Sequence, residues 1–280
     1  MLESSSAIVW CMPYGSQGKP YDLPHWKGMD DCLFAFCVTH VGSFFIRGKM
    51  DIILQGIKEG ISLIFSGDPE IFKIVGLSLF VSTIAVVISA CMGIPLGVLL
   101  GTHSFFAKGI VVRVIYTFMS LPPVIAGLVV FLVLMRRGPL GAFQLNYTPT
   151  AMVIAQICLV TPIIVGLTYN IVKEKAPIVN RLGLTLGAGR FRRIKLLIVE
   201  MRVGITTAVI SGFGRAISEV GAVMIVGGNI KGQTRVMTTY IAELKGMGNY
   251  ERAIAIGIIL LFLSFVVNAV LYSFQERESK

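Results

Sequence analysis

Two stretches of this 280-residue chain hold side chains that could do chemistry or receive a partner, and the first is residues 214–239. Arg215 and Glu219 stand four positions apart in an otherwise apolar run, with Ser218 beside them. Residues four apart lie on one face of a helix, so the two charges can form an ion pair. A charge inside an apolar span is costly, so such a pair faces a bundle interior or a watery path. Both roles stay open: the pair could pin the helix in a bundle, or line a gate or pathway.

The run that comes next, residues 227–239, combines glycines with amide, hydroxyl and cationic side chains. These are Asn229, Lys231, Arg235, Thr238 and Thr239. Glycine amides, hydroxyls and cations together suit a tetrahedral oxyanion. The same run could instead shape a gate or receive another protein, so direct contact with an anion is one of two interpretations.

The second stretch, residues 173–202, is basic, with eight Lys and Arg against two Glu. Ile178, Leu182 and Leu186 recur every four residues, which predicts one apolar face of a short helix. Pro177 suits the first turn of that helix, because the N–H that proline lacks has no helical partner there.

Gly187, Ala188 and Gly189 come after this helix and predict a sharp turn that ends it. The basic residues 190–195 then lead into the next apolar run. A helix, a glycine turn and a second helix predict a rigid knob with an apolar stripe, which could fill a groove on a soluble partner. A loop that is basic only because of membrane topology is the alternative.

The composition places the chain in a membrane. It is 55% hydrophobic and 14% charged, with a mean hydropathy of +0.79, whereas roughly a quarter of a typical globular sequence is charged. The net charge of +10 comes without a basic-aromatic module, so we expect no nucleic-acid partner. The five cysteines show no repeated spacing, and the histidines and acids form no catalytic cluster. We therefore expect no metal site, no catalytic residues and no cofactor bound by this chain.

Five apolar runs are long enough to cross a bilayer core of about 30 Å, which takes roughly 20 helical residues. They predict spans at about 74–101, 114–135, 148–172, 203–226 and 253–274. Helices are the expected form, because backbone amides in lipid must find partners within the segment. Pro122, Pro123 and Pro162 fall inside these spans and could act as hinges.

The distribution of basic residues predicts the orientation. Lys and Arg are more numerous in 102–113, 173–202 and 275–280 than in 136–147 and 227–252. The richer side is expected to be cytoplasmic. An odd number of spans then places the N-terminus outside and the C-terminus inside.

The N-terminal part differs from the rest. Residues 50–70 predict an amphipathic helix lying in the membrane interface, with a helix packed along the bundle as the alternative. Its apolar face holds Ile53, Ile57, Ile61 and Ile64. Residues 1–49 have no periodicity, and we interpret them as a non-native or disordered extension, with Met50 as the true start.

Two segments carry a resemblance to a known family. Residues 214–222 and 226–239 are similar to the end of the fourth core helix in ATP-binding-cassette permeases for molybdate and tungstate, most of all the tungstate type. The segment around Gly187 resembles the cytoplasmic EAA motif of these permeases. Gly187 corresponds to the glycine of that motif, and Arg181, Leu182 and Gly183 stand at its triplet. The resemblance extends over about residues 50–274.

The resemblance implies a fold and a function. The fold is an all-α integral membrane protein whose residues 71–274 form the five-helix type I importer core. The function is the multi-pass cell-membrane permease subunit of an importer for tungstate, or alternatively for molybdate or another oxyanion. The permease works as a homodimer in membrane lipid, with two cytoplasmic ATPase subunits and an extracytoplasmic oxyanion-binding protein.

The energy source and the site residues are implied by the same resemblance. No G-x-x-x-x-G-K-S/T loop occurs, so ATP and Mg are expected on the partner ATPases, and the chain itself is not an enzyme. A secondary transporter is the rival class, but it would show a longer chain with inverted repeats. Residues that couple to the ATPase would be Ile178, Leu182, Leu186, Gly187, Ala188 and Gly189 in the coupling loop 173–202. Pathway or gate residues would be Arg215, Ser218, Glu219, Asn229, Thr238 and Thr239.

Overall fold

The computed structural model describes residues 54–60, 62–63 and 68–279, and the predicted extension 1–49 lies outside them. The described part is built of helices and turns, with no strand among these residues. Three of its helices are long and apolar enough to cross a membrane, and five spans result if each of two bent helix pairs counts as one. The predicted all-α membrane fold is therefore confirmed, while the orientation of the termini remains a prediction.

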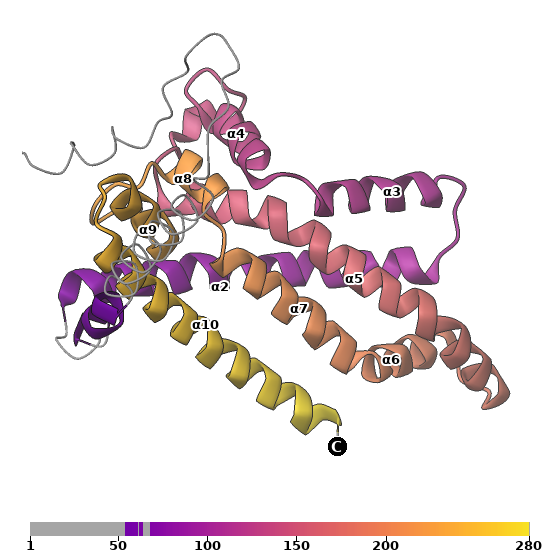
Figure 1. Ribbon diagram of the computed structural model, residues 1–280. Helices are drawn as coiled ribbons and strands as arrows, with labels where there is room; N and C mark the ends of the chain where they lie inside the picture. Colours follow the sequence, from indigo (N-terminus) through magenta and orange to yellow (C-terminus); the bar gives the residue numbers. More distant parts are fainter. Residues whose placement is uncertain (1–53, 61, 64–67, 280) are drawn as a thin grey trace, which may run out of the picture. The chain divides into compact units, whose positions relative to one another are not determined.

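Three long helices coincide with predicted spans (Figure 1). They are α2 (Pro69–Thr102), α5 (Pro149–Thr185) and α10 (Tyr250–Ser279). Each begins within five residues of the predicted start, and α5 runs on well beyond the predicted end at residue 172. The charged part of the coupling loop thus begins as a continuation of a membrane span.

Residues 114–135, expected as one span, instead divide into α3 (Lys108–Met119) and α4 (Pro123–Leu134), bent by 100°. The break coincides with Pro122 and Pro123. Proline lacks the N–H of a helical hydrogen bond and keeps the residue before it out of the α conformation. Two successive prolines therefore end one helix and start another, a stronger effect than a hinge within a span.

The expected fourth span, 203–226, is also interrupted. α6 (Arg190–Glu200) and α7 (Arg202–Ile217) meet at a 58° bend. Regular helix then stops at Ile217, and the short α8 (Gly221–Gly227) begins after a break. The break was not predicted, because the sequence there stays apolar apart from its charged pair.

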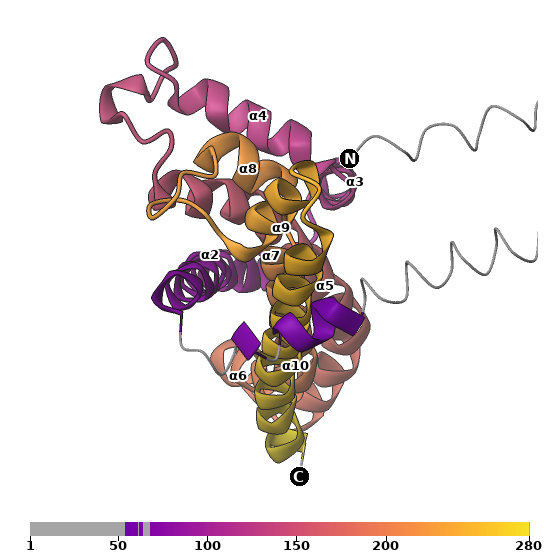
Figure 2. The same cartoon turned by 60° about the vertical axis from the view of Figure 1, so that its left-hand side comes forward.

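A further short helix, α9 (Met237–Gly246), and a 3-10 turn, η2 (Gly141–Phe143), complete the described elements. Figure 2 shows α8 beside α4 and α9 at the start of α10, in agreement with their contacts.

α2 and α5 pack closely against each other. Gly93, Gly97 and Gly101 recur every four residues on the side of α2 that faces α5. A Cβ added at Gly97 would come within 2.6 Å of Thr168. Membrane helices pack through such small residues, because close backbone approach maximises van der Waals contact. The glycines near the end of the first predicted span thus hold it against the third.

The prediction that Pro177 starts a short helix is wrong. α5 continues through both Pro162 and Pro177. Proline removes the hydrogen bond to the carbonyl four residues back, which for Pro177 is that of Lys173. Lys173 is exposed, so water can reach the freed carbonyl and the helix continues.

The segment before α2 is helical where it is described, at residues 54–60 and 62–63. Its buried positions are Gly56 and Gly60, which face Ile254 and Ala255 of α10. Ile57, on the predicted membrane face, is exposed. The glycine face therefore packs along the bundle, as the alternative to an interfacial helix predicts, while contact of the isoleucine face with a membrane interface remains a prediction.

The bundle has two ends, which lie on opposite sides in Figure 1, and the segments at each end contain several basic residues. The Glu70 end consists of the start of α2, residues 228–236, α9 and the start of α10. The Gly187 end consists of the last three turns of α5, the turn at residues 186–189, and α6.

Candidate functional site

Gly187 forms the turn that ends α5. The Ala188 N–H donates to the carbonyl of Gly183 at 2.8 Å, and the Gly187 N–H donates to that of Leu184 at 3.1 Å. This pair of bonds closes a helix whose next residue is left-handed, and Gly187 has φ +66°. The predicted glycine turn is thus present at Gly187. Gly189 differs, because it has an ordinary extended backbone (φ −61°) and begins α6.

α6 packs against the end of α5. The side chain of Arg193 crosses Gly183 so closely that a Cβ there would lie 2.6 Å from the Arg193 Cγ. Leu197 is buried in the cluster between the two helices, and Lys175 pairs with Glu200 at 2.9 Å. α6 and the end of α5 therefore form one packed unit.

The apolar stripe predicted on this knob is found on its surface. Ile178, Leu182 and Leu186 are 60%, 59% and 79% exposed and line one cleft of about 420 Å³ with Leu196 of α6. Phe191, 85% exposed, adds a side chain that the sequence analysis missed. The prediction that these positions share one face is confirmed, and such a patch is typical of a surface that contacts another protein.

Glu219 lies at the break between α7 and α8 and is almost fully buried. The predicted pair with Arg215 is present but long, at 3.8 Å. The Glu219 carboxylate also accepts from the Ala222 N–H at 3.2 Å, and its backbone carbonyl accepts from the Thr238 hydroxyl at 2.9 Å. Ser218 does not join this group, because its hydroxyl bonds back to carbonyls of its own helix. Glu219 therefore links α7, α8 and α9.

Asn229 and Thr239, from the run 227–239, meet in a second cluster. The Thr239 hydroxyl donates to the Asn229 side-chain carbonyl at 2.8 Å, and the Asn229 amide donates to Glu243 at 2.9 Å. Arg235 pairs with the same Glu243 at 2.8 Å. These donors are directed at protein acceptors, so the arrangement favours a gate-shaping role over direct contact with an oxyanion.

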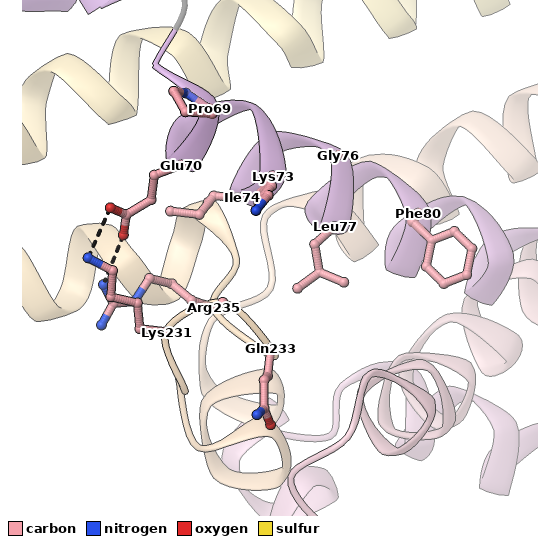
Figure 3. A pocket seen from close by; sticks show the side chains of 11 residues that line it. Pro69, Glu70, Lys73, Ile74, Gly76, Leu77, Phe80, Lys231, Gln233 and Arg235 are labelled. Atoms are coloured by element: carbon pink, nitrogen blue, oxygen red, sulfur yellow. Dashed lines mark ion pairs between the residues drawn. The ribbon is translucent and has the colours of Figure 1, made fainter.

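Glu70 and Glu243 were missed by the sequence analysis. The Glu70 carboxylate forms ion pairs with Lys231 at 3.0 Å and with Arg235 at 3.9 Å (Figure 3). The three residues lie at the rim of a cleft of about 640 Å³. Glu243 could have been found, since it lies four residues beyond Thr239 and shares its helix face. Glu70 left no signal, because no sequence pattern relates residues that far apart.

Gln156, two turns from the start of α5, was also missed. It is 4% exposed, and its amide donates to the carbonyl of Ala216 near the end of α7 at 3.1 Å. A polar side chain inside an apolar span was the available signal. Among residues 54–279 as far as they are described, no group of His, Cys, Asp or Glu could hold a metal ion.

Comparisons with known proteins give a consistent result. Residues 93–280 match the family described as binding-protein-dependent transport system inner membrane component. The tungstate uptake system permease protein TupB of Peptoclostridium acidaminophilum is 52% identical over 228 residues, which cover 81% of this chain and 100% of that protein. A probable anion ABC transporter permease protein of Haloferax volcanii is 44% identical over 211 residues, covering 73% and 90% of the two chains.

A solved structure matches the fold. A chain in the crystal structure of a bacterial ABC transporter involved in import of the acidic polysaccharide alginate superposes with a TM-score of 0.66 at 17% identity. The match covers 91% of this chain and 99% of that one. At this identity the likeness concerns the fold alone.

Proposed function

The chain belongs to the family of binding-protein-dependent transport system inner membrane components, and from this premise we propose that it is the transmembrane permease of an ATP-driven importer for tungstate. The observation that carries the choice of tungstate is the 52% identity with a tungstate uptake permease over that protein's whole length. A second tungstate uptake permease, from Campylobacter jejuni, is 30% identical over 227 residues. Sulfate permeases are more distant, at 24% identity for that of Escherichia coli K12.

The proposed partners are those that the family implies. An ATPase subunit supplies ATP hydrolysis, an external binding protein delivers the anion, and a second copy of this chain completes the pathway. The surplus of Lys and Arg supports a cytoplasmic Gly187 end and an outer Glu70 end. The ATPase would then seat the exposed residues Ile178, Leu182 and Leu186 in a groove on its own surface.

α5 provides the mechanical link between the two ends. It is one helix of 37 residues, about 55 Å long. A displacement of the knob at Gly187 is therefore transmitted along α5 to Gln156, whose amide holds the Ala216 carbonyl at the end of α7. The break beside it, which contains Glu219, is the place where the backbone can absorb the displacement.

This arrangement supports a gate at Glu219. When ATP binding draws the knobs together, α5 pulls on the end of α7, and the contacts of Glu219 with Arg215, Ala222 and Thr238 are rearranged. The anion delivered from outside then enters between the two copies. Binding there is expected to be weak, because conduction requires that the anion leave again.

The test is an uptake assay. Cells without tungstate uptake of their own receive this chain with its cognate ATPase and binding protein, and uptake of labelled tungstate, molybdate and sulfate is measured. Restored uptake of tungstate in preference to the other two anions is expected. Restored uptake of sulfate but not of tungstate would contradict the proposed substrate.

A further inference from the structure

The length of α2 indicates that the cleft at the Glu70 end is level with the lipid headgroups. α2 has 34 residues and is therefore about 51 Å long, whereas the hydrocarbon core of a bilayer is about 30 Å thick. Several residues at each end of α2 must then stand in the headgroup layer. Lys73 lies one turn from the start of the helix, and Leu77 and Phe80 lie one and two turns deeper, where the hydrocarbon begins.

The lining of the cleft changes from charged to apolar along the same direction. Figure 3 shows Lys73, Leu77 and Phe80 in order along α2, with Lys231, Gln233 and Arg235 on the facing loop. The floor between them is apolar, and Phe80 remains 54% exposed. The cleft is thus cationic at headgroup level and apolar below it.

The cationic end carries an excess of positive charge. Lys231 and Arg235 share the carboxylate of Glu70. Lys73 has no ion pair or hydrogen bond within the described residues, although it lines the same space. Arg235 is also neutralised by Glu243 at 2.8 Å, so Lys73 is the cation of the cleft that no described carboxylate pairs, and its charge is available to an anion.

We propose that this cleft binds an anionic phospholipid, with its phosphate at Lys73 and Lys231 and an acyl chain along Leu77 and Phe80. Lysine and arginine side chains close to a bilayer surface attract anionic headgroups through charge. A small oxyanion fits less well, because it would leave the apolar floor of the cleft unoccupied. The exposed face of α2 continues below the cleft with Val87, which is 54% exposed and lies seven residues, or two turns, beyond Phe80.

The first test removes the unpaired charge. The purified full-length chain, with the substitution Lys73→Gln, is incubated with phosphatidylglycerol and phosphatidylcholine, and retained lipid is measured by native mass spectrometry. Loss of one lysine near a lipid surface is expected to lower phosphatidylglycerol binding about fivefold. Lys245→Gln is the matched control, since Lys245 is exposed in α9 at the same end but does not line the cleft. It should leave binding unchanged.

The second test uses a variant whose added side chain fills the apolar part of the cleft. Gly76 lines the cleft, and a Cβ there would meet no atom within 4 Å, so Gly76→Leu leaves the fold intact while occupying the acyl-chain position. Retention of phosphatidylglycerol is expected to fall to the level of phosphatidylcholine. Gly257→Leu is the control, because Gly257 in α10 has the same open space but lies outside the cleft.

Three results would overturn the proposal. One is wild-type retention of phosphatidylglycerol in both cleft variants. Another is displacement of the lipid by soluble glycerol phosphate at equal concentration, which would indicate a site for small anions. The third is unchanged lipid retention together with lost stimulation by the binding protein, which would show that the cleft receives a protein segment. None of these results depends on which anion is transported.

Discussion

The two ends of the molecule both combine glycines with basic residues, but they use them differently. At the Gly187 end the cations Arg181, Arg192 and Lys195 make no ion pair within the described residues, and the apolar side chains beside them are exposed. At the Glu70 end the cations Lys231 and Arg235 are paired with acids. Within the described residues, the chain itself therefore neutralises these two cations of the Glu70 end, whereas the three at the Gly187 end have no acidic partner.

The two ends also differ in how far their contacts reach along the sequence. The turn at Gly187 is closed by hydrogen bonds to Gly183 and Leu184, a few residues away. At the other end, the backbone N–H of Met237 donates to the hydroxyl of Ser78 in α2 at 2.9 Å. The turn at Gly187 can form before the bundle is complete. The hydrogen bond between Met237 and Ser78 forms only when the spans have assembled.

The largest effect is expected at the Gly187 end, from Gly187→Val. The left-handed backbone conformation destabilises a residue other than glycine by roughly 1–2 kcal/mol, and a β-branched residue by more. We expect at least about a tenfold loss of anion-stimulated ATP hydrolysis in the complex reconstituted with its ATPase and binding protein, because the knob loses its shape. Gly109→Val is the control, since Gly109 lies in α3 outside the coupling loop, is exposed and has no atom within 4 Å of an added Cβ. Full stimulation in Gly187→Val would refute the coupling assignment.

Arg215→Ala tests the proposed gate at Glu219 rather than the Gly187 end. It leaves the buried Glu219 carboxylate without its cation, but the pair is long and Arg215 is 38% exposed, so the cost is about 1 kcal/mol. We expect tungstate uptake to fall several-fold while the ATPase still co-purifies with the chain. If assembly is lost instead, the pair serves only to pin the bundle.

Thr238→Val measures a single long-range bond of the Glu70 end. Removing its hydroxyl leaves the Glu219 carbonyl without that donor, at a cost of about 1 kcal/mol in the free energy of unfolding. Ser218→Ala removes a hydroxyl that bonds only within its own helix, and is expected to change stability by less than about 0.5 kcal/mol. Thermal unfolding in detergent compares the two. Equal effects would mean that the bond between α9 and Glu219 adds nothing beyond a local one.

The smallest effect is expected from Glu70→Gln. Its ion pair with Lys231 is solvent-accessible, and such pairs contribute about 0–1 kcal/mol. We expect a small loss of stability that disappears at high salt, because salt screens exposed charges. A large loss that persists in high salt would show that the Glu70 end depends on this pair more than its exposure suggests.

The sequence predicted those features that depend on local composition. The apolar runs predicted α2, α5 and α10, and the spacing of Ile178, Leu182 and Leu186 predicted their shared face. The break at Pro122 and Pro123 was interpreted only as a hinge, because proline shows where a helix is weakened but not how far the chain then turns. Pro177 was misinterpreted for the related reason that a helix can continue past a proline when water reaches the freed carbonyl.

By itself, then, the sequence determined the membrane class, the number of apolar runs, the turn at Gly187 and the resemblance to oxyanion permeases. These depend on burial in lipid and on backbone preference, both properties of short segments. Only the tertiary structure decided that Glu70 and Glu243 neutralise the cations of residues 227–239, and that Gln156 holds the end of α7. Ion pairs and hydrogen bonds between distant residues depend on distances that only packing sets, and no pattern along the chain records them.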